Sequence, residues 1–248
     1  MISRKPSAKI LIAILAHSSN EVIAKIVTYW NEMFPESDVM IVYGGTNENF
    51  EKVDYSAKRM VTDSRLRTQN HQRECQSYTG VFDQILTEVK KADYDFVYFT
   101  EFDHLPLRKD MFELLINQLG DNDVQFHVLQ QIDRTNNPHY LYHLAKSNFK
   151  QFFSQLSKRN DGAIFSAYGF GQLWRVEPLI EFASIEDSVG CYLELWMPTL
   201  AHHLGYSISS LRGQEKYHSF KGDFTDKIEE FTKDGAWSVH PVKNFWNK

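Results

Sequence analysis

The run Asp95-Phe96-Val97-Tyr98-Phe99-Thr100-Glu101-Phe102-Asp103-His104 joins a strand pattern to two acids. Five of the six residues after Asp95 are apolar, aromatic or β-branched, which is typical of a strand covered on both faces. Ligands of open α/β sheets bind outside the carboxyl ends of the strands, where Glu101 and Asp103 would stand. Neighbouring like charges need water or a cation to compensate them, and a hard divalent cation that bridges to a phosphate is one compensator. The alternative is a solvated strand end with ordinary surface acids.

The bulk composition is that of a globular protein, with 248 residues, 42% of them hydrophobic and 24% charged. The net charge of -5 argues against general polyanion binding, so no nucleic-acid partner is expected. The two cysteines, Cys75 and Cys191, lack metal-ligand spacing and favour a reduced, cytoplasmic protein, although one disulfide stays open. The seven apolar residues at 10–16 are too few to cross a bilayer and are predicted to form a strand. No other segment is long enough to be transmembrane.

Strand and helix patterns alternate in the first half of the chain. We expect strands at residues 9–16, 39–43, 58–62 and 96–100, and helices at 20–34 and 78–92. Such alternation indicates βαβ units, and therefore the α/β class with a mostly parallel sheet flanked by helices.

The second half is less regular. Helical patterns cover residues 109–119, 178–182 and 191–204, and strand patterns cover 125–131, 163–171 and 207–211. Residues 140–155 are mixed, and the chain becomes polar and loop-like from Arg212. Without repeats, low-complexity tracts or a linker, a single domain over residues 1–248 is expected.

This order of elements, with an acid-x-acid motif after Tyr94-Asp95-Phe96-Val97-Tyr98-Phe99, resembles GT-A glycosyltransferases. The resemblance implies a Rossmann-like mixed sheet, a nucleotide-sugar donor and a Mn²⁺ or Mg²⁺ cofactor held against the donor diphosphate. It places the donor-binding part at about residues 8–107 and the acceptor-side part at about 108–248. The motif here is Glu101-Phe102-Asp103, and Glu in the first acid position departs from the family's pattern. Asp103 is therefore the expected metal ligand, while Glu101 binds metal or orients the donor.

Two later segments also match the family. Glu194 lies near the start of a predicted helix that ends in Leu204-Gly205-Tyr206, and in inverting members this acid is the base that deprotonates the acceptor. His240 lies where the family brings a late histidine to the metal, and Lys243 could neutralise a phosphate. The alternatives are an ordinary helix N-terminal glutamate and a loop histidine beside a proline.

Other site predictions rest on position in the fold. The resemblance implies donor contacts for residues that follow the first two strands or precede the helix at 78–92, namely His17, Ser18, Gly44 and Arg73. It implies acceptor contacts for Gly171 and Trp174, although a core strand explains Trp174 equally well. His202-His203 is interpreted as helix-end polarity and not as a metal site, because two adjacent helix residues point in different directions. His139 and His143 have i, i+4 spacing, but no third ligand or His-Glu-x-x-His pattern accompanies them.

The predicted function is metal-dependent transfer of a sugar from a nucleotide-sugar to a hydroxyl of a glycan or lipid-linked acceptor, as in polysaccharide biosynthesis. A lipid-linked acceptor would require peripheral contact with a membrane. The runner-up is a sugar-phosphate nucleotidyltransferase, but such enzymes usually carry a Gly-rich basic loop where this chain has His17-Ser18-Ser19-Asn20. A third reading is a non-catalytic glycan- or nucleotide-binding domain of the same fold.

Overall fold

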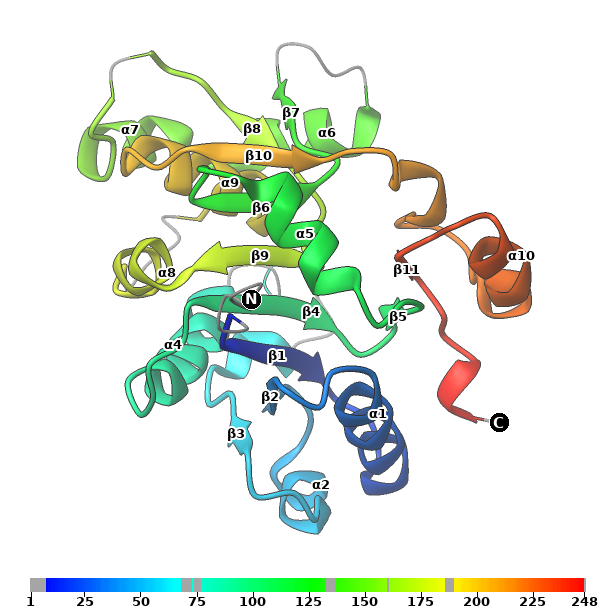
Figure 1. The fold of residues 1–248 in the computed structure, drawn as a ribbon. Coiled ribbons are helices and arrows are strands. Elements are labelled where there is room, and N and C mark those ends of the chain that lie inside the picture. Colours follow the sequence, from blue (N-terminus) through cyan, green and yellow to red (C-terminus); the bar gives the residue numbers. More distant parts are fainter. Residues whose placement is uncertain are drawn as a thin grey trace, which may run out of the picture.

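The computed structural model describes residues 8–67, 73, 77–132, 137–159, 161–185 and 190–247. Its centre is a seven-stranded sheet in the order β10-β6-β9-β4-β1-β2-β3, which runs from top to bottom in Figure 1. The strands are β1 Ile10–Ala16, β2 Asp38–Tyr43, β3 Lys58–Met60, β4 Phe96–Glu101, β6 Val124–His127, β9 Gln172–Arg175 and β10 Ile208–Leu211. Only β9 runs antiparallel to its neighbours in this sheet. The predicted α/β class with a mixed, mostly parallel sheet is confirmed.

Helices cover both faces of the sheet (Figure 1). On one face lie α1 Asn20–Met33 and α5 Met111–Leu119; on the other lie α4 Tyr78–Val89, α8 Val176–Ala183 and α9 Leu193–His203. Alternate residues of β1 enter the two cores, because successive side chains of a strand point to opposite faces. The unbroken apolar sequence of β1 therefore follows from its burial on both sides.

The parallel register brings the carboxyl ends of three strands to one edge. Ala16 of β1 pairs with Tyr43 of β2, and Leu15 pairs with Glu101 of β4. The loops that follow these strands therefore begin side by side, as the rule for ligand sites in α/β sheets requires.

Two predicted strands differ from the observed ones: one is divided and the other is shorter. The expected strand at 125–131 becomes β6 and β7 Gln130–Gln131, because Val128 adopts a positive φ of 53° that breaks the extended backbone. The expected strand at 163–171 contributes only β8 Phe165–Ser166, and the sheet strand β9 begins after Gly171.

The polar segment after Arg212 was predicted as a loop, but much of it folds. It contains α10 Ile228–Lys233 and β11 Ser238–Val239, and β11 pairs antiparallel with β5 Leu105–Pro106. This pairing returns the C-terminal segment to the end of β4. The remaining elements are α2 Asn47–Lys52, α6 Pro138–Lys146, α7 Phe149–Gln155, and the short 3₁₀ turns η1 Ser64–Arg67, η3 Glu215–Tyr217, η4 Thr225–Lys227 and η5 Phe245–Asn247. Within the described ranges, no helix has the length and apolar character that a membrane crossing needs.

Candidate active site

A cavity of about 700 Å³ opens at the carboxyl edge of β1, β2 and β4. Its wall combines residues that follow these strands with residues from the second half of the chain. Seven residues predicted from sequence line it: His17, Gly44, Glu101, Asp103, Glu194, His240 and Lys243. The other four, Ser18, Arg73, Gly171 and Trp174, do not.

Glu101, Asp103 and His240 form a compact ligand set in this wall. Each offers one ligand atom, and the three atoms lie within 4.8 Å of one another. Glu101 ends β4 and Asp103 occupies the following turn. His240 arrives through the β5–β11 pairing, and the backbone N–H of Val242 donates to the Asp103 carbonyl at 2.9 Å.

The hydrogen bonds of His240 determine which ring nitrogen faces the acids. Its Nδ1 lies 2.9 Å from the Ser219 carbonyl oxygen, and a carbonyl only accepts, so Nδ1 carries a proton. In the neutral ring Nε2 then presents a lone pair, and this atom is 3.3 Å from Asp103 Oδ1. A lone pair facing a carboxylate oxygen is stabilised when a cation binds both atoms.

The electrostatics of the two acids also fit a cation. Asp103 Oδ1 is buried and has no hydrogen-bond partner among the described residues. Burial, together with the negative charge of Asp103, raises the pKa of Glu101 to about 7, although the Tyr78 hydroxyl donates to Glu101 Oε1 at 3.1 Å. Two carboxylates and one imidazole suit Mn²⁺, and carboxylates also suit Mg²⁺. The residues present therefore fit the cofactor that the sequence predicts.

Glu194 stands in the first turn of α9 and is largely buried in the cavity wall. The Gly169 backbone N–H donates to its Oε1 at 3.2 Å, and the Tyr192 hydroxyl donates to its Oε2 at 3.4 Å. His139 Nε2 lies 3.5 Å from the same Oε2. A carboxylate held in this way could accept a proton from a substrate hydroxyl.

His139 is the site residue that sequence reasoning missed. It comes from α6, lines the cavity, lies 3.1 Å from the Tyr192 hydroxyl and stacks with Phe220 at 5.7 Å between ring centroids. Its i, i+4 spacing to His143 does not indicate the tertiary contact with Glu194. The Asn137 cap, whose side chain accepts from the His139 backbone N–H, is the local signal that a helix starts here.

Only some of the residues predicted to contact a donor line the cavity. The ring of His17 packs edge-on against Phe102 at 4.8 Å between centroids. Ser18 lies outside the wall, and its carbonyl accepts from Tyr43. The arginine that reaches the cavity is Arg67 rather than the exposed Arg73, and its Nε donates to the Gly45 carbonyl at 2.6 Å.

The acceptor predictions for Trp174 and Gly171 are wrong. Trp174 is fully buried in β9, an internal strand between β4 and β6, and its indole packs against Phe82, Phe126 and Phe182. It has no surface to offer an acceptor. Gly171 is also buried, and it contacts the histidine rings behind the cavity instead of lining it.

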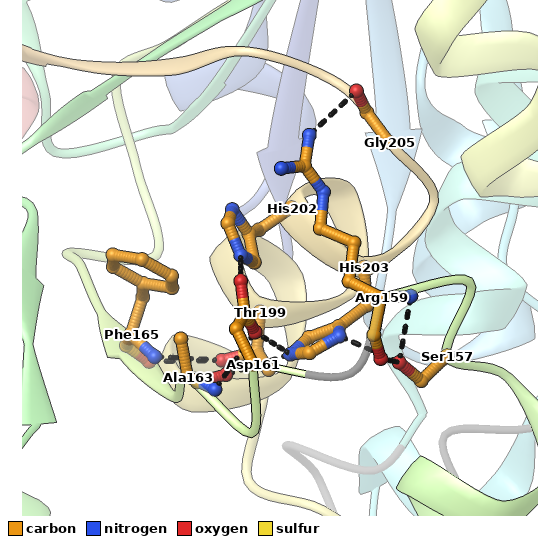
Figure 2. Close-up of polar contacts among 9 residues, drawn as sticks. All are labelled: Ser157, Arg159, Asp161, Ala163, Phe165, Thr199, His202, His203 and Gly205. Carbon is orange, nitrogen blue, oxygen red and sulfur yellow. Dashed lines mark hydrogen bonds and ion pairs between the residues drawn. The ribbon is translucent and has the colours of Figure 1, made fainter.

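The structure brings Asp161 to His202 and His203, and these three side chains offer atoms within 4.8 Å of one another (Figure 2), so the interpretation of the histidines as a non-metal pair stays a prediction. His203 Nε2 lies 2.7 Å from the Ala163 carbonyl oxygen, so this nitrogen carries a proton and has no lone pair for a cation. His202 Nε2 pairs with Asp161 Oδ2 at 2.8 Å. These contacts tie the end of α9 to the loop that precedes β8. Cys191 is buried, whereas Cys75 lies outside the described residues.

No protein-family model and no curated protein matches the sequence. The fold resembles several solved structures at low identity. Bifunctional IspDF from Campylobacter jejuni has 13% identity and a TM-score of 0.47, over 90% of this chain and 54% of that one. Mannosyltransferase PcManGT from Pyrobaculum calidifontis, in complex with GDP-Man and Mn²⁺, has 12% identity and a TM-score of 0.45, over 84% and 56%. An active-site mutant of LgtC has 12% identity and a TM-score of 0.46, over 94% and 86%.

The chain spans a little over half the length of the first two of these proteins. The neighbours are GT-A glycosyltransferases and nucleotidyltransferases of the same nucleotide-diphospho-sugar transferase fold. At these identities and TM-scores the likeness assigns no activity to this chain, so the site geometry carries the functional argument.

Proposed function

We propose that this protein is a metal-dependent glycosyltransferase that moves a sugar from a nucleotide-sugar donor to a hydroxyl of a glycan or lipid-linked acceptor. The observation that carries the proposal is the set Glu101, Asp103 and His240, with the unpartnered Asp103 Oδ1, in the same cavity as Glu194. One cavity thus contains a cation site and a separate carboxylate that can act as a base.

Each part of the wall has a proposed task. Asp103, His240 and Glu101 would hold Mn²⁺ or Mg²⁺, which when bound offsets the charge that develops on the leaving nucleoside diphosphate. Lys243 adds a positive charge for a diphosphate at the rim. His17 and Gly44 border the ends of β1 and β2, where a base or ribose would lie.

Glu194 is the proposed general base of an inverting transfer. The acceptor oxygen bonds to the anomeric carbon, the bond from that carbon to the diphosphate oxygen breaks, and the acceptor proton passes to Glu194. Gly169 and Tyr192 hold the carboxylate in place. Phe170, Tyr192 and Phe220 offer aromatic surface on which a sugar ring could pack.

We further propose that residues 1–248 act as one domain, since both the donor-side and the acceptor-side parts line the cavity. The low cysteine count supports the cytoplasm as its compartment.

The decisive experiment measures thermal stability with a panel of nucleoside diphosphates, with and without Mn²⁺, in the wild type, Asp103→Asn and Asp121→Asn. Asp121 is an exposed acid after α5 and serves as the matched control. We expect a cation-dependent rise in Tm in the wild type and in Asp121→Asn that is lost in Asp103→Asn, because Asp103 links the cation to the protein.

Turnover is then followed with a panel of nucleotide-sugars as release of nucleoside diphosphate. Absence of both binding and turnover with either cation would refute the proposal. Release of pyrophosphate from a nucleoside triphosphate and a sugar phosphate would instead identify a nucleotidyltransferase. Donor binding without bond cleavage would identify a non-catalytic domain.

A further inference from the structure

Three histidines meet in the interior beside the candidate active site. His104 directly precedes β5, His127 is the last residue of β6 and His218 directly follows η3. Their relative exposures are 0%, 2% and 4%. One ring nitrogen of each lies within 4.8 Å of those of the other two. The His127 and His218 ring centroids are 4.2 Å apart, and that of His104 is 5.4 Å from His218 and 5.7 Å from His127.

Two of these rings have a buried nitrogen without a partner. Among the described residues, neither His104 Nε2 nor His127 Nε2 has a hydrogen-bond partner. Leaving a buried polar atom unsatisfied costs roughly 1–3 kcal/mol. Two such atoms on adjacent rings therefore indicate that a ligand belongs between them.

The outer nitrogens are arranged as in metal-bound imidazoles. His218 Nδ1 lies 2.8 Å from the Gln214 carbonyl oxygen, so it carries the proton, and the Nε2 lone pair accepts from Ser238 Oγ at 3.0 Å, a contact that a bound cation would replace. His104 Nδ1 lies 2.6 Å from Thr100 Oγ1, a hydroxyl oxygen that can accept a hydrogen bond from the Nδ1–H. Such bonds fix the tautomer that turns Nε2 toward a cation.

The backbone of Gly171 packs closely against two of the rings. Its φ is +66°, and a Cβ added to it would lie 2.6 Å from His127 Nε2 and 3.0 Å from His104 Cε1. Any side chain at this position would displace the rings, so the observed arrangement of the histidines requires glycine here.

We propose that His104, His127 and His218 form a second, buried metal site that takes Zn²⁺ through three imidazole nitrogens, with water as the fourth ligand. Zinc accepts neutral imidazole and four-fold coordination, whereas Mg²⁺ requires oxygen ligands. The site is distinct from the carboxylate-rich set around Asp103, although the His104 and His240 rings are only 6.1 Å apart. Its existence does not depend on the proposed transfer reaction.

The test starts from the full-length protein freed of metal by a chelator. Zn²⁺ is added and the bound metal per chain is measured; Co²⁺ is added separately, and its visible spectrum reports four-fold coordination. The variants are His127→Gln and His218→Gln. Asp103→Asn and His202→Gln are controls for the two other groups of potential ligands, Glu101 with Asp103 and His240, and Asp161 with His202 and His203. Circular dichroism verifies that each variant is folded.

In Asp103→Asn, which lacks a ligand of the carboxylate-rich set, we expect one Zn²⁺ per chain and a four-coordinate Co²⁺ spectrum, and the wild type and His202→Gln should retain this Zn²⁺. Affinity should fall more than about 100-fold in His127→Gln and His218→Gln, since loss of even an outer-shell partner weakens binding by about 10–100-fold. If a variant does not fold, X-ray absorption at the zinc edge of the wild type decides by counting imidazole ligands, of which three are expected. Absence of stoichiometric Zn²⁺, or binding that survives in His127→Gln and disappears in a control, would overturn the site.

Discussion

Two side chains in the cavity wall, His240 and Glu194, are held by hydrogen bonds with neighbouring groups while part of each side chain faces the cavity. The Nδ1 of His240 is held by the Ser219 carbonyl, and its Nε2 faces Asp103. Glu194 is held by the Gly169 N–H and the Tyr192 hydroxyl while it lines the cavity. These hydrogen bonds hold both side chains in position, which is the preorganisation that the proposed transfer would require.

At the same scale, Glu194→Gln should separate chemistry from donor binding. The amide keeps the size of the side chain but cannot take a proton, so kcat for sugar transfer should fall by about 10²–10⁴-fold while the Kd of the donor changes little. Glu177→Gln is the matched control, because Glu177 stands exposed in the first turn of α8. Steady-state kinetics and donor titration provide both quantities. An equal loss in the control, or an unchanged kcat in Glu194→Gln, contradicts the role of base.

Among the elements, β9 begins at a point of close packing behind the cavity. It is the one antiparallel strand of the seven-stranded sheet, and it begins directly after Gly171. The positive φ of Gly171 makes the turn into β9, and its lack of a side chain accommodates His127. One residue therefore serves both the backbone path and the packing of the histidine cluster.

Gly171→Ala and Gly162→Ala distinguish these two effects. Gly162 has a similar φ of +63° but nothing within 4 Å of an added Cβ. Each substitution should lose about 1–2 kcal/mol of unfolding free energy from the left-handed backbone. Gly171→Ala should lose about 1–3 kcal/mol more, because the new methyl group overpacks against His127. Equilibrium urea unfolding of the metal-free proteins measures the difference, and equal losses would show that the histidine moves aside without strain.

For the molecule as a whole, the sequence predicts the elements whose burial is expressed in an unbroken apolar run. β1, β2 and β4 and the two acids after β4 follow from such runs and from the rule on strand ends. The break at Val128 was not predictable, since a β-branched residue rarely adopts positive φ. The internal place of β9 depends on its pairing with β4 and β6, which local pattern does not encode.

The residues of the candidate site, like the elements of the fold, were only partly predictable from the sequence. Asp103 was predictable from its strand, and His240 from its resemblance to a late family motif. Their contact depends on the β5–β11 pairing in a segment that looks like a loop. His139 reaches Glu194 only through tertiary packing, so no spacing in the sequence could indicate it.

The pH dependence of the free energy of unfolding should reflect the protonation of Glu101. In the metal-free folded protein its pKa is raised from 4.5 to about 7 by burial and by Asp103, so between these pH values the folded state holds a proton that the unfolded chain has released. This contribution to stability is fully present below pH 4.5 and is lost as the pH rises through about 7. Glu101→Gln should therefore flatten the stability curve over this interval, whereas Glu113→Gln, an exposed acid in the first turn of α5, should leave the slope unchanged.

Mn²⁺ should reverse the sign of this dependence. The cation needs the ionised carboxylate, so its stabilising effect should grow as the pH rises through about 7, the pKa of Glu101 in the metal-free protein. At a concentration about 100 times its Kd the gain approaches about 2.7 kcal/mol for a ligand that binds only the folded state. Chemical unfolding across the interval, with and without Mn²⁺, measures both trends in the wild type and the two variants. Parallel curves for the wild type and Glu101→Gln would mean that the Glu101 carboxyl group does not titrate in this pH interval. They would also mean that the proton and the cation do not compete for this carboxylate.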